Sequence, residues 1–366
     1  MDLTPIAAAF GLQGTLERTE EICNGNINRT YEVTVCERGS SDSQRYIFQR
    51  LNTYVFQRPC EVMNNILAVT EHIKKRLCLR DGSHERRVLS FLTTSEGKPY
   101  VDDPEQGFWR AYRFVDHART YNLIENPYYF REAGLAFGEF QGLLSDFPAR
   151  SLTETIPHFH NTAKRMRDFR QALDEDRAGR AAEIRRETEY LLENEEQTGE
   201  LVRMLDSGVI PYRVTHNDTK INNVLFDTVT DRAICVIDLD TVMPGASAYD
   251  FGDAVRSGAS TAEEDEENLD KVSFSLELFE QFTEGFLNGT AGLLTSAEID
   301  VLPLGAKILT LELASRFLAD YLNGDIYFKV TKPRHNLIRA RTQIELAKDI
   351  EKKYSRMQEI VNRHRP

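Results

Sequence analysis

Cysteines are too few and too scattered in this sequence to build a stabilising framework. The five of them are odd in number, and no two are spaced as CxxC: Cys23, Cys36, Cys60, Cys78 and Cys235. This spacing argues against a disulfide-rich secreted fold and against a cysteine-based zinc cluster. We expect reduced thiols, most of them in the hydrophobic core.

Long apolar segments are also missing. No run of 18 apolar residues occurs, and the N-terminal sequence has neither the basic start nor the sustained apolar stretch of a signal peptide. The sequence therefore predicts a cytoplasmic protein without a membrane partner.

An excess of basic residues is lacking as well. The formal net charge is −13, from 45 Lys and Arg against 58 Asp and Glu, and the two signs are interspersed along the chain. Because binding to a nucleic-acid backbone depends on clustered basic residues, the sequence argues against a nucleic-acid partner. The 366 residues, 41% of them hydrophobic, can bury a sizeable core and favour two lobes over one.

Residues 1–117 are predicted to form a small sheet with one helix. Residues 29–40 and 44–52 are rich in β-branched and aromatic side chains and predict a hairpin. A helix with apolar residues every three or four positions follows. Residues 86–103 and 107–116 are again strand-like, which gives the order strand, strand, helix, strand, strand.

Residues 118–366 are predicted to form a larger, mostly helical lobe. An Asn-Pro start signal at Asn126 opens an amphipathic helix, and the chain is again helical from about residue 272 onward. Short strands are expected only within residues 212–241. Together with the N-terminal sheet, these helices predict an α+β protein of two lobes.

The segment VTHNDTKINNVLFD, residues 214–227, places polar side chains on a loop between two predicted strands. Phosphoryl transfer needs metal ions that neutralise the phosphates and one carboxylate that accepts the proton of the attacking hydroxyl. Asp218 is the candidate base. Asn223, five residues later, and Asp238, at the end of an apolar strand, are candidate Mg²⁺ ligands, because amide and carboxylate oxygens suit a hard cation.

Three motifs resemble the aminoglycoside phosphotransferase family, a small-molecule branch of the kinase superfamily. HNDTKINN resembles its catalytic loop, VIDLD its metal-binding strand end, and PGASAYDFGD the start of the helix that supports the loop. The resemblance implies the two-lobed protein-kinase-like fold, with ATP and Mg²⁺ as cofactors. It also implies that Asp250 supports the loop and that Lys220 faces the transferred phosphoryl group.

Within that family the similarity is closer to the kinases of N-acetylhexosamines, and it extends along nearly the whole chain. This similarity implies transfer to the C1 hydroxyl of the sugar. It implies sugar contacts from Arg316 and Tyr327, with Asn28 as a secondary candidate. The ring of Tyr121 is either a stacking face for the sugar or part of the core. The alternatives are a kinase of the same family that acts on choline, homoserine or an aminoglycoside, and a pseudokinase that binds nucleotide without catalysis.

The nucleotide contacts are less regular than in protein kinases. Gly25 and Asn26 lie where a loop would cover the phosphates, and Gly25 would permit close approach of the backbone. Gln49 stands where the resemblance places a strand lysine, so the phosphate charge must be neutralised by another group. The hinge is predicted at residues 112–118, with adenine contacts from Arg113, Phe114 and Val115.

Several residues have two interpretations in the sequence. Asp240 is either a second metal ligand or a turn residue, and His216 is expected to support the loop rather than to transfer protons. His158 and His160 have metal-chelating spacing but lack a carboxylate partner, which favours packing. Arg316 and Asp320 are four apart on a predicted helix and are either an ion pair or hydroxyl ligands. The oligomeric state and the preferred hexosamine are left open.

Overall fold

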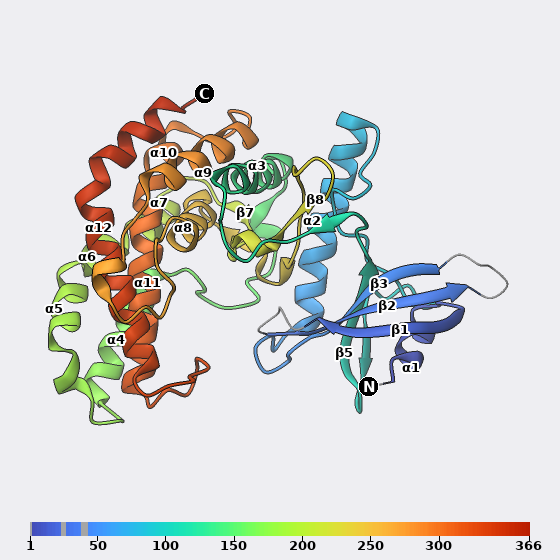
Figure 1. Cartoon of the computed structure of the whole chain (residues 1–366), viewed down its shortest axis with the longest axis horizontal. Helices are drawn as coiled ribbons and strands as arrows, with labels where there is room; N and C mark the ends of the chain where they lie inside the picture. Colours follow the sequence, from blue (N-terminus) through green and yellow to red (C-terminus); the bar gives the residue numbers. More distant parts are fainter. Residues whose placement is uncertain (1, 23–26, 38–42) are drawn as a thin grey trace.

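The computed structural model describes residues 2–22, 27–37 and 43–366, which form a small β-rich lobe and a larger helical lobe (Figure 1). The N-terminal lobe contains an antiparallel five-stranded sheet of order β1-β2-β3-β5-β4. Its strands are β1 (Gly14–Ile22), β2 (Arg29–Glu37), β3 (Ser43–Arg50), β4 (Val101–Asp103) and β5 (Gly107–Arg113).

Two helices accompany this sheet. The short helix α1 (Thr4–Ala9) contributes Ile6 and Ala7 to a core with the buried face of β2, β3 and β5. The long helix α2 (Pro59–Asp81) buries a stripe at helical spacing, which confirms the predicted helix. It ends at Gly82, whose left-handed backbone (φ +75°) lets the chain turn away.

The predicted hairpin is confirmed by β2 and β3, whereas the strand predicted across residues 86–103 is only partly formed. Its end forms β4, and an isolated bridge joins Phe91 to Tyr112. The sequence interpretation missed both α1 and β1. Strand β1 is an edge strand with mostly exposed and charged side chains, so it lacks the alternation that marks a half-buried strand.

Two small sheets lie at the base of the helical lobe and carry the polar loops. Strand β6 (Ala118–Arg119) pairs with β8 (Val224–Asp227), which pairs with β9 (Ala233–Val236). Strand β7 (Arg213–Thr215) pairs with β10 (Met243–Gly245). The segment that resembles a catalytic loop therefore runs from β7 to β8, and both of its ends are fixed by strand pairing.

The rest of the larger lobe is helical. Helix α3 begins where Asn126 accepts a hydrogen bond from the Tyr128 amide, which confirms the predicted start signal. The helices are α3 (Pro127–Leu143), α4 (Thr162–Glu175), α5 (Arg185–Glu193), α6 (Glu195–Thr198), α7 (Glu200–Asp206), α8 (Ser247–Gly258), α9 (Leu276–Gly289), α10 (Ser296–Asp300), α11 (Leu302–Leu322) and α12 (His335–Arg363). Helix α11 is buried along nearly its whole length and contacts α4, α8 and α12 (Figure 1).

Glycines allow α3 and α9 to approach until their backbones touch. A Cβ at Gly138 would lie 2.2 Å from the Phe286 carbonyl oxygen, and one at Gly285 would lie 2.0 Å from the Arg131 carbonyl oxygen. Because backbone atoms cannot rotate away, any larger residue must separate the two helices.

Gly285→Ala is therefore expected to lower the free energy of unfolding by about 1–3 kcal/mol, measured by denaturant titration. Gly199→Ala is the matched control, since its new Cβ would meet the flexible end of the Arg203 side chain. Equal stability of the two variants would contradict backbone contact between α3 and α9.

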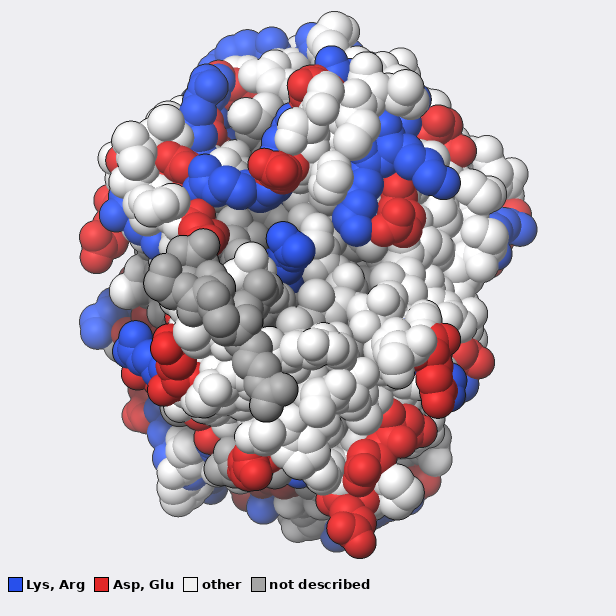
Figure 2. Space-filling view, turned by 90° about the vertical axis from the view of Figure 1, so that its right-hand side faces the viewer, with Lys and Arg blue, Asp and Glu red and all other residues white. Residues whose placement is uncertain are grey.

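The surface carries both charge signs. On the side of the molecule that Figure 2 shows, Lys and Arg side chains alternate with Asp and Glu side chains. None of the described helices is both long enough and apolar enough to cross a membrane.

Candidate active site

The loop between β7 and β8, which carries Asp218, is held by a buried carboxylate on α8. The Asp250 side chain is fully buried and accepts hydrogen bonds from the backbone amides of His216 (3.0 Å) and Asn217 (2.8 Å), and from the Gln141 side chain (2.8 Å). Burial nevertheless raises the pKa of Asp250. Asn217 has a positive φ of 65°, a backbone conformation that residues other than glycine rarely adopt, and these hydrogen bonds hold the loop in it.

His216 is fully buried beneath this loop. Its Nε2 is 2.8 Å from the Ile237 carbonyl oxygen, and its ring packs edge-on against Phe137 and Phe140. This places His216 between the loop of Asp218 and the strand end that carries Asp238. Such a position suits a supporting role and keeps the imidazole away from solvent.

Asp218 faces a solvent-accessible cavity, and two side chains contact its carboxylate. The Lys220 Nζ lies 3.0 Å from Asp218 Oδ1, and the Asn223 amide nitrogen donates to Asp218 Oδ2 at 3.1 Å. The negative charge of Asp218 raises the pKa of Lys220. The carboxylate is thus held in one orientation and paired with a half-exposed ammonium group.

Asp238 follows β9 in a left-handed backbone conformation (φ 59°). Its carboxylate makes no hydrogen bond or ion pair among the residues that the structure describes. The surrounding protein limits the hydration of this carboxylate, and repulsion from Asp240 and Asp218 adds to that effect, so the pKa of Asp238 is raised to about 7. The residue is nevertheless exposed at the cavity, and a cation bound there would relieve the repulsion between the carboxylates.

Asn223 and Asp238 are suited to a hard divalent cation. Both side chains line one cavity, and the Asn223 amide nitrogen is engaged by Asp218, which leaves its oxygen for a ligand. Among the described residues, no group of three or more His, Cys, Asp or Glu side chains is placed to hold a metal. Mg²⁺ is a cation that often takes only one or two protein ligands and completes its shell with phosphates and water.

A buried arginine lies beside Gln49. Arg110 on β5 is 2% exposed; its guanidinium forms an ion pair with Asp240 and donates from Nε to Gln49 Oε1 at 2.9 Å. Gln49 in turn donates to Thr30 Oγ1 at 3.1 Å. Burial opposes the charge of Arg110, but the attraction of Asp240 outweighs it and raises the pKa of the guanidinium.

This network gives Asp240 and Asn28 partners that the sequence did not indicate. Arg110 binds one carboxylate oxygen of Asp240, and the Asn28 amide binds the other at 2.5 Å. Asn28 also accepts a hydrogen bond from the Asn52 backbone amide at 3.0 Å. It lines the cavity of Asp218 and Asp238 rather than the cavity of Arg316, and its contact with a sugar stays a prediction, as does a metal contact of Asp240.

The cavity that contains Asp218 lies between the two lobes and measures about 450 Å³. One end is apolar, and the other carries the carboxylates described above. The apolar end is formed by side chains of one packed cluster: Ile22, Ile47, Leu89, Phe114, Val115, Leu225 and Ile237. A flat aromatic ring at the apolar end and charged groups at the polar end would match this distribution.

The hinge is only partly available for recognition. The backbone amides of Arg113 and Phe114 donate to the carbonyl oxygens of Ser90 and Arg45, both at 3.0 Å. These two amides are therefore engaged within the protein, whereas the Phe114 side chain lines the cavity, and its contact with adenine stays a prediction. Val115 lines the cavity, and its amide has no partner among the described residues. Gly25 and Asn26 lie outside the described residues.

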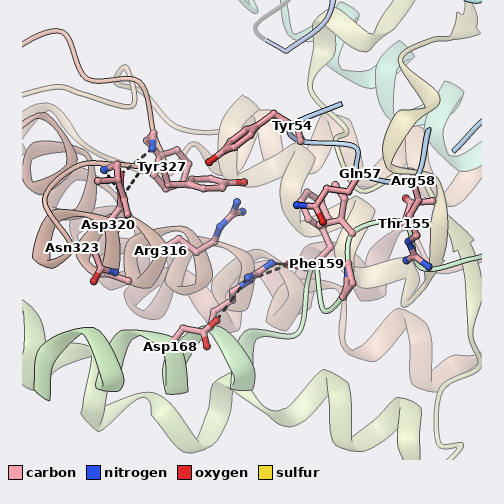
Figure 3. Close-up of a pocket in the computed structure, with 17 residues that line it drawn as sticks. Tyr54, Gln57, Arg58, Thr155, Phe159, Asp168, Arg316, Asp320, Asn323 and Tyr327 are labelled. Carbon is pink, nitrogen blue, oxygen red and sulfur yellow. Dashed lines mark hydrogen bonds and ion pairs between the residues drawn. The ribbon is translucent and has the colours of Figure 1, made fainter. Parts of the chain in front are cut away.

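A second cavity of about 740 Å³ lies beside α11 (Figure 3). Figure 3 shows the Arg316 side chain projecting into it, near the rings of Tyr54 and Tyr327. The Arg316 guanidinium carbon lies 5.5–6.0 Å from three ring centroids, those of Phe159, Tyr327 and Phe328. Its nearest carboxylate oxygen is Glu312 Oε1 at 4.0 Å, which leaves its donors facing the cavity.

Asp320 is not the ion-pair partner of Arg316. Its carboxylate accepts three consecutive backbone amides, those of Ile326, Tyr327 and Phe328, at 2.8–3.0 Å, and the Asn336 side chain at 2.8 Å. Asp320 therefore fixes the loop that brings Tyr327 to the cavity.

Tyr121 lies in a packed aromatic cluster. Its ring stacks on Tyr129 with a centroid distance of 4.2 Å and meets Phe226 edge-on. It lines neither of the two cavities described above, so its ring is not placed to stack on a sugar.

Sequence reasoning did not identify the contributions of three residues to the site. Arg110 left a weak signal, an arginine within an otherwise apolar strand. His160 was expected to pack without a carboxylate partner, but it pairs with the buried Glu312 carboxylate and also contacts the loop of Asp218 through the Asn217 carbonyl. Tyr54 reaches the second cavity from the segment between β3 and α2, which no local pattern marked.

Solved structures resemble this fold along nearly the whole chain. The microcompartment-associated aminopropanol kinase is 18% identical, with a TM-score of 0.60 and coverage of 98% of this chain and 99% of that one. An aminoglycoside phosphotransferase from Alicyclobacillus acidocaldarius subsp. acidocaldarius is 13% identical, with a TM-score of 0.61 and coverage of 97% and 96%. A spectinomycin phosphotransferase in complex with ADP and spectinomycin is 14% identical, with a TM-score of 0.54 and coverage of 99% and 97%.

The two lobes and these likenesses define a kinase-like α+β fold, as predicted. The model of the phosphotransferase enzyme family called APH matches residues 18–281. The chain belongs to this family, and its class is that of the small-molecule phosphotransferases.

Proposed function

We propose that this protein transfers the γ-phosphoryl group of ATP to the C1 hydroxyl of an N-acetylhexosamine in a Mg²⁺-dependent reaction. The observation that carries the acceptor class is the cavity of Arg316, which offers hydrogen-bond donors and aromatic faces. The second support is the similarity of RVTHNDTKINNVLFD, VIDLDTVMPG, FGDAVRSGASTAEED and RFLADYLNGDIYF to N-acetylhexosamine 1-kinase.

The charges of the acceptor cavity favour a neutral sugar over a cationic alcohol. The cavity is lined by three arginines, Arg58, Arg165 and Arg316. Its two carboxylates are already satisfied, since Asp168 accepts Lys164 at 2.7 Å and Asp320 accepts backbone amides. A quaternary or primary amine would meet guanidinium groups without a free carboxylate, whereas hydroxyl and acetamide oxygens accept hydrogen bonds from them.

The nucleotide would occupy the cavity between the lobes, with adenine at the apolar end. The ADP complex of the spectinomycin enzyme supports a nucleotide in a fold of this kind. Asn223 and Asp238 would hold Mg²⁺, which neutralises the charge of the phosphates when it is bound. Arg110 lies behind Asp240 and stabilises this acidic end of the cavity.

The residues of the chain then have separate roles in the reaction. Asp218 accepts the proton of the C1 hydroxyl, while the Asn223 amide keeps its carboxylate oriented. The demand on this base is modest, because an anomeric hydroxyl is more acidic than an ordinary alcohol. Lys220, already 3.0 Å from Asp218, provides positive charge where the phosphoryl group passes between the two substrates.

The deciding experiment is an assay of ADP release with MgATP across a panel of acceptors. The panel contains N-acetylglucosamine, N-acetylgalactosamine, glucose, choline, aminopropanol, homoserine and an aminoglycoside, and phosphorus NMR locates the new phosphate. We expect a C1-phosphorylated N-acetylhexosamine. Activity with a cationic acceptor alone would overturn the proposal of a sugar acceptor. No ADP release with any acceptor, together with intact ATP binding, would favour the pseudokinase.

Arg316→Gln is expected to raise the KM for the sugar roughly 10- to 100-fold, which corresponds to the loss of charged hydrogen bonds to a ligand. The KM for ATP should change little, because Arg316 lines only the second cavity. The matched control is Arg356→Gln, which removes an exposed arginine on α12. An unchanged sugar KM in Arg316→Gln would contradict this placement of the acceptor.

A further inference from the structure

A buried ion pair lies between the acceptor cavity and the catalytic loop. His160 Nδ1 is 2.9 Å from Glu312 Oε1, and His160 Nε2 is 3.2 Å from the Asn217 carbonyl oxygen. Both side chains are buried. Because both neighbours of the ring are hydrogen-bond acceptors, both ring nitrogens must donate, and the imidazole is positively charged. Burial opposes that charge, but Glu312 outweighs it and raises the pKa of His160.

Glu312 connects this pair to the acceptor cavity. Its second oxygen accepts the Thr162 hydroxyl at 2.7 Å, and its first lies 4.0 Å from Nη1 of Arg316, one helical turn further along α11. The residue before His160, Phe159, lines the same cavity. A continuous path of contacts therefore leads from Arg316 through Glu312 and His160 to the Asn217 carbonyl.

The Asn217 carbonyl belongs to the peptide bond that joins Asn217 to Asp218. A hydrogen bond to this oxygen fixes the plane of that peptide and so the direction in which Asp218 leaves the loop. The loop needs such bonds because Asn217 has a positive φ, which costs on the order of 1 kcal/mol for a residue other than glycine. Asp250 holds the amide side of the loop, and His160 holds the carbonyl side.

We propose that His160 and Glu312 are positioning residues that orient Asp218 and connect it to the acceptor cavity at Arg316. This inference rests on the proposed function, in which Asp218 is the base and Arg316 contacts the acceptor. Loss of the His160 contact lets the peptide plane rotate, so the base is misplaced while nucleotide and acceptor still bind. Loss of this contact is therefore expected to lower kcat and to leave the KM values for ATP and for the acceptor nearly unchanged.

The test compares three variants with the full-length protein. His160→Phe keeps a ring of similar shape but no donor, and it is expected to lower kcat on the order of a hundredfold. His160→Gln keeps one donor for the Asn217 carbonyl and should recover at least a tenth of the wild-type kcat. The KM values for ATP and sugar should stay within about threefold of wild type in both variants, since neither substrate contacts this ring.

His160→Phe leaves Glu312 as a buried charge without its main partner and is at risk of not folding. The double variant His160→Phe/Glu312→Leu removes both charges and is expected to be folded, to bind ATP and to remain slow. If the double variant turns over at the wild-type rate, the proposal is overturned. It is equally overturned if His160→Gln is no faster than His160→Phe, because a purely structural ring would not be rescued by a donor.

A double-mutant cycle tests the link to the acceptor. Arg316→Gln and His160→Gln should be non-additive in kcat/KM for the sugar by about threefold or more, because they share Glu312. Additive effects would overturn the link. A wild-type protein that is silent toward N-acetylhexosamines but active on another panel member would instead contradict the proposed acceptor. The His160 variants can then be measured with that substrate.

Discussion

Asp218→Asn is expected to lose nearly all turnover, on the order of a thousandfold or more, while MgATP still binds. The asparagine keeps the size of the side chain and an oxygen for the Asn223 amide, so the loop should keep its shape. What disappears is the ability to accept the proton of the attacking hydroxyl. The measurement is kcat with saturating sugar and ATP, together with calorimetric titration of the nucleotide.

The matched control for this variant is Asp174→Asn, which neutralises an exposed carboxylate on α4. It should keep the wild-type rate. If Asp218→Asn kept more than about a tenth of the wild-type turnover, the base would have to be another group, because a general base contributes roughly 10²- to 10⁴-fold.

Arg110→Met is expected to lower the free energy of unfolding by about 3–5 kcal/mol, the usual cost of removing one partner of a buried ion pair. Arg110 and Asp240 are only 2% and 4% exposed, so the Asp240 carboxylate would keep its charge in a poorly solvated place. Asp238, which also feels the charge of Arg110, would become harder to ionise. Denaturant unfolding measures the loss of stability, and the KM for ATP should rise in parallel.

The double variant Arg110→Met/Asp240→Asn distinguishes the cost of the unpaired Asp240 charge from the cost of changing the shape of the Arg110 side chain. It removes the isolated carboxylate and is expected to regain at least half of the lost stability. A single variant that costs less than about 1 kcal/mol, or a double variant no more stable than the single one, would show that the ion pair does not stabilise this part of the fold.

The grouping of Asp218, Asn223 and Asp238 in one cavity could be predicted from the sequence because its signal is local. Asp218 and Asn223 are five residues apart on one loop. Asp238 follows β9, the second strand after that loop. Both spacings can be seen within a short stretch of sequence and do not depend on contacts between distant elements. The helix α2 and the hairpin of β2 and β3 were predicted for the same reason. Their periodicity is contained within each segment.

The supporting contacts could not be predicted because the chain brings them together from far apart. Arg110 meets Gln49 only through the register of β3 and β5, and Asn28 reaches Asp240 across 212 positions. Glu312 and His160 are 152 positions apart. No spacing in the sequence encodes such pairs, and their partners become evident only when the sheet and the helices are packed.

The segment between β3 and α2 touches both cavities, since Phe56 lines the one with Asp218 and Tyr54 and Gln57 line the other. A ligand that contacts this shared segment in one cavity can change the affinity of the other cavity for its ligand, and such a change in affinity is reciprocal. On this view sugar and nucleotide would each tighten the binding of the other. If the acceptor and the nucleotide stabilise each other in this way, hydrolysis of ATP by water would be slow until the acceptor is bound.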